Sequence, residues 1–249
     1  MNRGMPEICD DFLDNDCDWD LDCDDSDCQN EPRCQPPCPG DPDCPPGTWG
    51  CTHEPRECHG FYFDCACYMD TPVVVDVEGD GVALTDAAGG VEFDIDADGT
   101  RPKVAWTAAG SDDAWLALDR DGNGSIDSAA ELFGDVTPQP PSGELNGFLA
   151  LAEFDKPARG GNADGLLDER DAVAASLRLW RDANHDGLSE PGELHTLRSL
   201  GLRSIHLDYK ASRRTDRHGN KFRYRAKVTD VRGAQTGRWA WDVFLLRAL

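Results

Sequence analysis

The feature that most constrains this chain is a short acidic pattern that recurs five times between residues 76 and 187. In each copy, acidic or amide side chains occupy alternate positions and a glycine follows. A hard cation such as Ca²⁺ requires this spacing, because a loop that supplies about six to eight oxygens must fold around the ion and turn sharply at its sixth position. Without a cation, the crowded carboxylates would repel one another and oppose folding.

The strongest match to a calcium-binding loop covers residues 182–193. Gly187 stands at position 6, and ligands are predicted at positions 1, 3, 5, 7, 9 and 12. In that order they are Asp182, Asn184, Asp186, the carbonyl of Leu188, Glu190 and Glu193. Ser189 stands at position 8, where an aliphatic residue usually joins a short β-bridge to a partner loop. The alternative for this segment is a polar connection between two helices.

A less regular loop precedes this one. Its predicted ligands, at positions 3, 5, 9 and 12, are Asn162, Asp164, Asp168 and Asp171. Position 1 falls on Gly160, and Asp155 would supply that ligand only if residues 156–161 bulged outward. The alternative is a glycine-rich turn with solvated charges.

Three further clusters lie upstream. The ligands predicted for the longest are Asp119, Asp121, Asn123, Ser125, Asp127 and Glu131, the last standing one residue later than the pattern requires. The ligands predicted for the other two are Asp94, Asp96 and Asp98, and Asp76, Glu78 and Asp80. Neither of these two shorter clusters has a closing acid, so a tight acidic hairpin turn is the alternative for both.

Apolar periodicity predicts the surrounding elements. The run of valines at 73–77 predicts a strand, and helices are predicted at 145–154, at 172–180 and, ended by Gly201, at 194–200. We therefore expect an α+β fold in which two calcium loops share a helix at 172–181. Together they would form a paired helix–loop–helix unit of EF-hand type over about 145–200.

The carboxyl-terminal part has a different period. Apolar and basic residues alternate from 221 to 228, and a second alternating run follows a turn, which predicts a β-hairpin over about 220–247. Its basic face consists of Lys221, Arg223, Arg225 and Lys227. That face would be either solvent-exposed or an internal partner of the acidic loops.

Charge and cysteine content predict two domains, 1–70 and 71–249. The first holds all 11 cysteines of the chain, with 18 acidic residues against 3 basic ones. Many cysteines in a Pro- and Gly-rich segment predict disulfides in an oxidising, extracellular compartment, although no signal peptide is visible. The acids of 14–22 would form calcium loops or a solvated spacer. As an alternative to disulfides, the cysteines and histidines of 51–67 could bind zinc.

Several function classes are disfavoured. The net charge of −24 argues against a nucleic-acid partner, which a basic face would have to bind. The apolar stretches are shorter than the roughly 18–20 residues that span a bilayer. Hydrolase and phosphate-binding motifs are absent, and carboxylates two residues apart around a glycine have ligand spacing rather than acid–base spacing.

Longer motifs occur in a fixed order between residues 71 and 210: TPVVVDVEGDG, LALDRDGNGSID, NADGLLDERDA, LRLWRDANHDGLSEPGELHTL and LGLRSIHLDYK. In these motifs the chain resembles the bacterial calcium-binding module that occurs as the self-processing domain of iron-regulated RTX-type secreted proteins. Separately, the segment EICDDFLDNDCDWDLDCDDSDC is similar to Asp- and Cys-rich metal-binding repeats of bacterial secreted proteins.

The resemblance implies a calcium-folded module that cleaves an Asp-Pro bond at its own amino-terminal edge. There the aspartate carboxylate attacks its own carbonyl carbon, and a lysine can capture the resulting anhydride. The matching junction here, Asp70-Thr71-Pro72, lacks that bond, and the only Asp-Pro pair is Asp41-Pro42. We therefore expect a secreted or cell-surface protein, not an enzyme, that several Ca²⁺ ions stabilise and whose partner is another extracellular or surface protein. Self-processing is the alternative, and the cysteines disfavour a cytosolic calcium sensor.

Overall fold

The computed structural model describes residues 61–63, 66–68, 71–142, 145–235 and 237–248. The strands are β1 (Phe61–Phe63), β2 (Ala66–Tyr68), β3 (Val73–Val75), β4 (Val91–Glu92), β5 (Lys103–Val104), β6 (Ala114–Leu118), β7 (Leu166–Leu167), β8 (Leu177–Trp180), β9 (Leu194–His195), β10 (Leu202–His206), β11 (Lys210–Thr215), β12 (Lys221–Asp230) and β13 (Trp239–Phe244). The helical segments are α1 (Gly147–Asp155) and the 3₁₀ turns η3 (Ala129–Glu131), η4 (Pro157–Arg159), η5 (Ala172–Ala175) and η6 (Arg198–Leu200).

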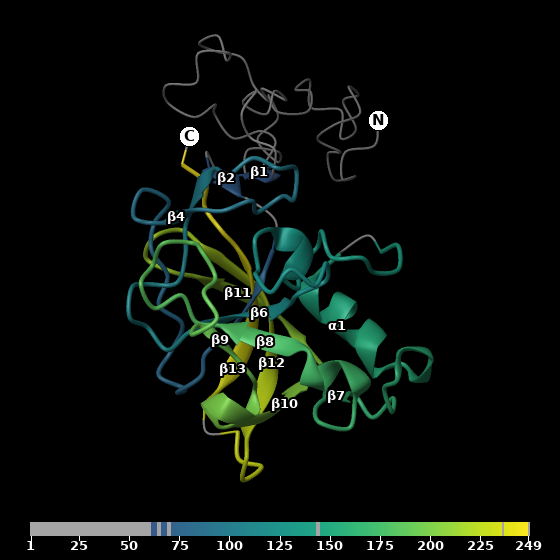
Figure 1. The fold of residues 1–249 in the computed structure, drawn as a ribbon. Helices are drawn as coiled ribbons and strands as arrows, with labels where there is room; N and C mark the ends of the chain where they lie inside the picture. Colours follow the sequence, from purple (N-terminus) through teal and green to yellow (C-terminus); the bar gives the residue numbers. More distant parts are fainter. Residues whose placement is uncertain (1–60, 64–65, 69–70, 143–144, 236, 249) are drawn as a thin grey trace, which may run out of the picture. The chain divides into compact units, whose positions relative to one another are not determined.

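A nine-stranded antiparallel sheet organises the segment from β3 onward (Figure 1). Its strand order is β7-β10-β12-β13-β3-β6-β8-β9, and β11 pairs with β12 beside this path. The strands β4 and β5 form a separate two-stranded sheet, as do β1 and β2. The expected α+β fold with paired helix–loop–helix units is therefore wrong, because the described part of the chain is mostly β and contains one α-helix.

The expected helix at 172–180 shows why that prediction failed. Only the 3₁₀ turn η5 precedes the strand β8, which pairs with β6 on one side and β9 on the other. Leu177 and Leu179, two residues apart, point to one face of the sheet, as in a strand. The apolar residues of this segment also fit the spacing of an amphipathic helix, so periodicity alone could not distinguish the two. The two pairing partners lie outside the segment, and its local sequence does not reveal them.

The expected helix at 194–200 is likewise replaced, by β9 and the short turn η6. Gly201 ends η6 in the left-handed conformation, with φ of 73°, as its place after the apolar residues predicted. Three other elements are confirmed: the strand after residue 72, the helix α1, and the hairpin of β12 and β13. The predictions about the cysteine-rich segment fall almost entirely outside the described residues.

The large sheet is covered on both faces. On one face, Val73, Leu116 and Leu177 pack in a cluster with Phe148 and Leu151 of α1. On the other, Trp106 lies at the centre of an aromatic cluster, 4.6 to 5.4 Å from the rings of Phe93, Trp115 and Trp180, centroid to centroid. Trp115 and Trp180 are cross-strand partners in β6 and β8 and are fully buried, as is Trp106. This aromatic cluster lies directly against one of the acidic loops.

Candidate metal sites

All five acidic loops share one backbone turn. In each, the first aspartate accepts hydrogen bonds with both carboxylate oxygens, and one bond always comes from the backbone N–H of the glycine at position 6. The aspartate–glycine pairs are Asp76–Gly81 (3.0 Å), Asp94–Gly99 (3.2 Å), Asp119–Gly124 (2.9 Å), Asp155–Gly165 (2.9 Å) and Asp182–Gly187 (2.9 Å). These glycines have φ between 71° and 109°.

Position 4 is also left-handed in every loop. The residues there are Gly79, Ala97, Gly122, Ala163 and His185, with φ between 56° and 85°. Three of them carry side chains, for which this conformation is unfavourable. The same two left-handed positions therefore recur in five loops of different sequence, which indicates that one loop geometry is imposed at all of them.

The aromatic cluster holds the first and last predicted ligands of loop 182–193. The indole Nε1–H of Trp106 donates to Asp182 at 2.9 Å, and that of Trp180 donates to Glu193 at 3.3 Å. Asp182 is 3% exposed, and burial raises the pKa of its carboxyl, while hydrogen bonds from the loop, the Gly187 amide first, oppose that shift. The remaining carboxylate and amide groups of the loop gather on its outer side, where Asn184 donates to Asp186 at 3.0 Å.

Loop 155–171 uses Asp155 as its first residue. The 3₁₀ turn η4 and the left-handed Gly160 form the outward bulge that this requires. The Asp155 carboxylate accepts from the backbone N–H groups of Asp164 at 3.2 Å and Gly165 at 2.9 Å, the same bonds that Asp182 makes in its loop. A side chain at Gly161 would stand 2.2 Å from the Asp155 backbone, so the bulge needs glycine there.

A cation of the chain itself lies on this second loop. The Arg170 guanidinium contacts Asp164 at 2.6 Å and Asp168 at 2.8 Å, which are positions 5 and 9. Its hydrogen bonds to Asp168 lower the pKa of that carboxyl. The closing acid Asp171 is 3% exposed and accepts from the Asp168 backbone N–H at 2.8 Å, while its second oxygen is buried without a partner.

In loop 119–131, carboxylate oxygens of Asp119, Asp121 and Glu131 lie within 4.8 Å of one another. Glu131 is 4% exposed, and its two oxygens accept the backbone N–H groups of Arg120 and Asp127, both at 3.0 Å. Burial raises the pKa of the Glu131 carboxyl. The turn η3 brings this acid inward although it stands one residue later than the pattern requires. Asn123 donates to both Asp121 and Asp127.

The cluster at 94–98 also brings three carboxylates within 4.8 Å. Asp94 accepts the backbone N–H of Asp98 at 3.1 Å in addition to that of Gly99. Both carboxylate oxygens of Asp96 are shielded from solvent and have no hydrogen-bond donor. Two buried acceptor oxygens without a donor fit a cation, because burying an uncompensated carboxylate is costly.

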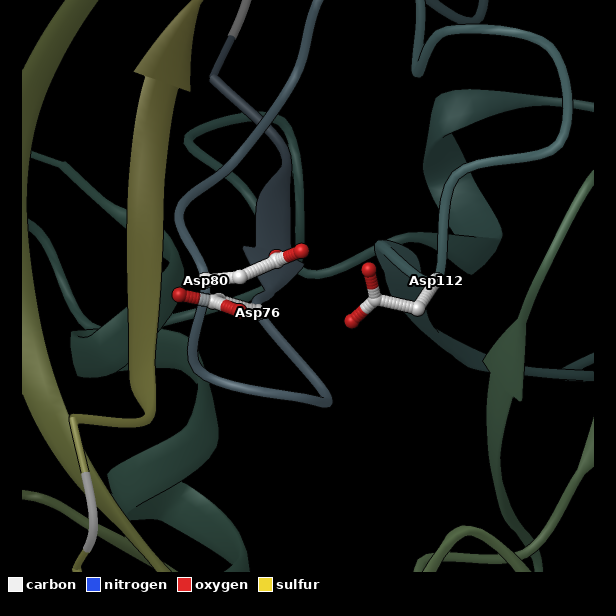
Figure 2. Close-up of side chains that lie close together, drawn as sticks. All are labelled: Asp76, Asp80 and Asp112. Carbon is white, nitrogen blue, oxygen red and sulfur yellow. The ribbon is translucent and has the colours of Figure 1, made fainter.

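The remaining triad combines two segments that are distant in sequence. Figure 2 shows Asp76 and Asp80 with Asp112, whose carboxylate oxygens lie within 4.8 Å of one another. Glu78 is exposed and outside this group, and its backbone N–H donates to Asp112 at 2.6 Å. Sequence reasoning missed Asp112. The signal available was the acidic pair Asp112-Asp113 just before a strand; burial, with the charges of Asp112 and Asp76, raises the pKa of Asp113 to about 7.

Two of the loops contact each other at their eighth positions. The hydroxyl of Ser189 accepts the backbone N–H of Ile126, at 2.6 Å, so loop 182–193 meets loop 119–131. The expected partner of loop 182–193 was the loop that closes at Asp171. The atypical Ser189 thus supplies through its side chain a contact that a backbone bridge was expected to make.

These observations define the class of protein: an antiparallel β module with five acidic loops that share one turn geometry. The chain belongs to the SPM domain family, whose model matches residues 73–245. It is 38% identical over 165 residues to the iron-regulated protein FrpA of Neisseria meningitidis serogroup C. That alignment covers 65% of this chain and 14% of the relative, so the chain spans a small part of that protein. The resemblance to an iron-regulated bacterial protein is confirmed.

None of the helices among the described residues has the length and apolar character needed to cross a membrane.

Proposed function

We propose that this chain is a secreted calcium-binding protein whose module is folded and stabilised by several Ca²⁺ ions. The observation that carries the proposal is the shared turn of the five loops, in which both oxygens of one aspartate accept backbone N–H groups of the turn. In the three upstream clusters, three carboxylates also lie within 4.8 Å of one another. All ligands offered are carboxylate, amide and carbonyl oxygens, which Ca²⁺ prefers and which softer metals such as zinc use less. The buried, donor-free oxygens of Asp96 support the same assignment.

Charge gives a second reason. Residues 71–194 contain 26 acidic and 8 basic residues. Backbone N–H groups satisfy the first aspartate of each loop, but they leave the outer carboxylates close together. An ion that binds only the folded chain stabilises it by mass action and removes this repulsion. The folded module should therefore depend on calcium more than a domain with balanced charge would.

An extracellular location agrees with the sequence. All 11 cysteines precede residue 68, a distribution that favours disulfides outside the cell. Calcium outside cells is abundant, so affinities of about 10⁻⁴ to 10⁻³ M suit a structural role there. The self-processing alternative has less support, because the junction that matches the family cleavage site holds Thr71, which is 1% exposed and carries no carboxylate.

Calcium-dependent folding can be tested directly on the full chain. Circular dichroism and thermal unfolding are recorded in chelator, in millimolar Ca²⁺ and in millimolar Mg²⁺. We expect an expanded or partly unfolded chain in chelator and cooperative compaction with Ca²⁺. Mg²⁺ should substitute poorly, because it dehydrates reluctantly and demands a rigid octahedral site. Identical spectra and melting temperatures in chelator and in Ca²⁺ would refute a structural role for calcium.

A further inference from the structure

The carboxyl-terminal strands carry a group of cations that the proposed calcium loops do not use. Residues 195–249 hold 13 basic residues against 4 acidic ones. The ion pairs formed among the described residues involve other cations. Lys210, Arg213, Arg225 and Lys227 are all exposed, and no described carboxylate lies within ion-pair distance of any of them.

Strand register places three of these cations on one face. Lys210 of β11 is the direct cross-strand partner of Arg225 in β12, and Arg225 is in turn the partner of Trp241 in β13. Lys227 lies two residues beyond Arg225 and pairs with Trp239. Directly opposed residues of an antiparallel sheet share a face, about 4.5–5.5 Å apart, and like charges there are destabilising. Lys210 and Arg225 therefore repel each other, and no carboxylate among the described residues lies close enough to neutralise them.

Aromatic rings hold the arginines of this face in place. The Arg225 guanidinium carbon lies 4.5 Å from the Trp239 ring centroid and 5.6 Å from that of Trp241. The guanidinium carbon of Arg214, in β11, lies 4.0 Å from the Phe222 ring centroid and 5.1 Å from that of Trp241. Stacking orders a guanidinium while leaving its N–H fork able to bind a planar carboxylate, so less entropy is lost on binding.

The same face ends at an open sheet edge. β11 pairs with β12, and among the described strands no other pairs with β11. Most of its residues are exposed. An edge strand presents unpaired backbone groups and can accept an additional strand, whose side chains then alternate between the two faces. An incoming strand with acidic residues at alternate positions would place its carboxylates beside Lys210 and Arg225.

We propose that β11 and the adjoining face of β12, formed by Lys210, Arg225 and Lys227, bind an extended acidic segment of a partner protein by strand addition. The segment would carry carboxylates at every second position. The cations would select those carboxylates, while backbone hydrogen bonds to β11 would require an extended conformation. A nucleic acid is disfavoured as occupant, because the acidic residues of the rest of the chain would repel a long polyanion.

The test uses the full chain in millimolar Ca²⁺ at about 0.15 M salt, where long-range charge effects are screened. The probe is a fluorescein-labelled peptide with the sequence of residues 14–22 and serine in place of Cys17, in which acids occupy alternate positions. A scrambled peptide of the same composition, with its five aspartates in one block, has the same charge without the alternation. A single-stranded oligonucleotide serves as a non-peptide polyanion. Binding is measured by fluorescence anisotropy.

Matched triple variants locate the surface. The variant Lys210→Gln, Arg225→Gln, Lys227→Gln should bind the alternating peptide about tenfold more weakly or worse. The control variant Lys156→Gln, Arg198→Gln, Arg232→Gln loses the same charge from cations that already lie near acidic residues, and it should bind as the parent does.

Three results would overturn the proposal: equal binding of the scrambled peptide, tighter binding of the oligonucleotide, or no binding of the alternating peptide. The comparison of the two peptides on the parent chain keeps the proposal testable if the triple variant melts early. Calcium binding by the same proteins is measured in a separate titration. A failure of the proposed calcium function can therefore be distinguished from a failure of peptide binding.

Discussion

Loops 182–193 and 155–171 have the same turn in different surroundings. In both, the first aspartate accepts two backbone N–H groups of the turn. In both, an asparagine side chain also donates to the aspartate two residues later, Asn184 to Asp186 and Asn162 to Asp164. The two loops differ in the groups that contact their acidic side chains. Two buried tryptophans donate to the first and last acids of loop 182–193. In loop 155–171, five additional residues lie between the first aspartate and the turn, and Arg170 forms ion pairs with two of the acids.

The turn and the electrostatic environment of a loop are therefore separable. The turn depends on one aspartate and two left-handed positions, so it survives the insertion after Asp155. The electrostatic environment depends on which neighbours the fold supplies. We therefore expect loop 182–193 to be rigid and to bind calcium more tightly, and loop 155–171 to bind it in competition with an arginine.

The largest expected effect comes from removing the first aspartate. Asp182→Ala should lower the free energy of unfolding in millimolar Ca²⁺ by about 2–4 kcal/mol, because it leaves the buried Trp106 and Gly187 N–H groups without an acceptor. Asp155→Ala should cost about half as much, since Asp164 and Gly165 are exposed and water can replace the lost acceptor. Urea unfolding compares the two. Equal losses would show that the tryptophan bond does not distinguish the loops.

Removal of a closing acid should have the next largest effect. Glu193→Gln should weaken calcium binding at its loop by about ten- to a hundredfold, because position 12 supplies two oxygens to the ion. Glu169→Gln is the matched control, since this exposed glutamate lies outside the predicted ligands. Calorimetric titration measures both. If the two variants lost affinity equally, the assignment of loop 182–193 would be wrong.

A change remote from both loops should shift stability without altering their difference. Asp242 is fully buried and accepts the Gly147 N–H at 2.7 Å, and burial raises its pKa from 3.8 to about 8. The folded chain keeps a proton that the unfolded chain loses above pH 4, so stability should fall between pH 5 and 8, by on the order of 1 kcal/mol per pH unit.

Asp242→Asn removes this titration while an amide oxygen can still accept from Gly147. Its melting temperature in saturating Ca²⁺ should therefore fall less between pH 5 and pH 8 than that of the parent chain. Parallel melting curves of the two proteins over this range would contradict the assignment of the buried proton to Asp242.

A smaller effect is expected where the arginine competes. Arg170→Gln should raise the calcium affinity of loop 155–171 about two- to fivefold, because an exposed ion pair of this kind is worth little. Arg198→Gln, which removes the same charge nearby, should leave it unchanged. The amide NMR signals of Gly165 and Gly187 follow the two loops separately during titration. If Arg170→Gln changed the calcium affinity reported by Gly187 but not that reported by Gly165, the assignment of Arg170 as a competitor in loop 155–171 would be wrong.

No effect at all is expected on the covalent chain. Filling either loop with calcium should leave the chain intact for hours at mildly acidic to neutral pH, since the family junction lacks an aspartate before Pro72. Mass spectrometry checks this. Fragments divided after Asp70 or Asp41, and abolished by Asp→Asn at that position, would replace the binding reading with the self-processing one.

The turns of the loops follow from local sequence. The glycine at position 6 lies in a short stretch in which a few residues decide the turn, and Asp155 enters its loop through the bulge that the spacing required. Sequence reasoning failed for the helices at 172–180 and 194–200 because Leu177 and its neighbours fit either period. The helix α1 was predicted correctly because Asn146 caps it and no strand competes for its residues.

Where the chain turns, and which oxygens each loop offers, follow from local sequence, because aspartate and glycine control φ and hydrogen bonding within about six residues. Three features follow only from long-range packing: β8 is a strand, Asp112 joins Asp76 and Asp80, and Ser189 contacts Ile126. These outcomes depend on backbone groups and carboxylates separated by tens of residues. Their pairing is set by the register of the whole sheet, which local sequence does not specify.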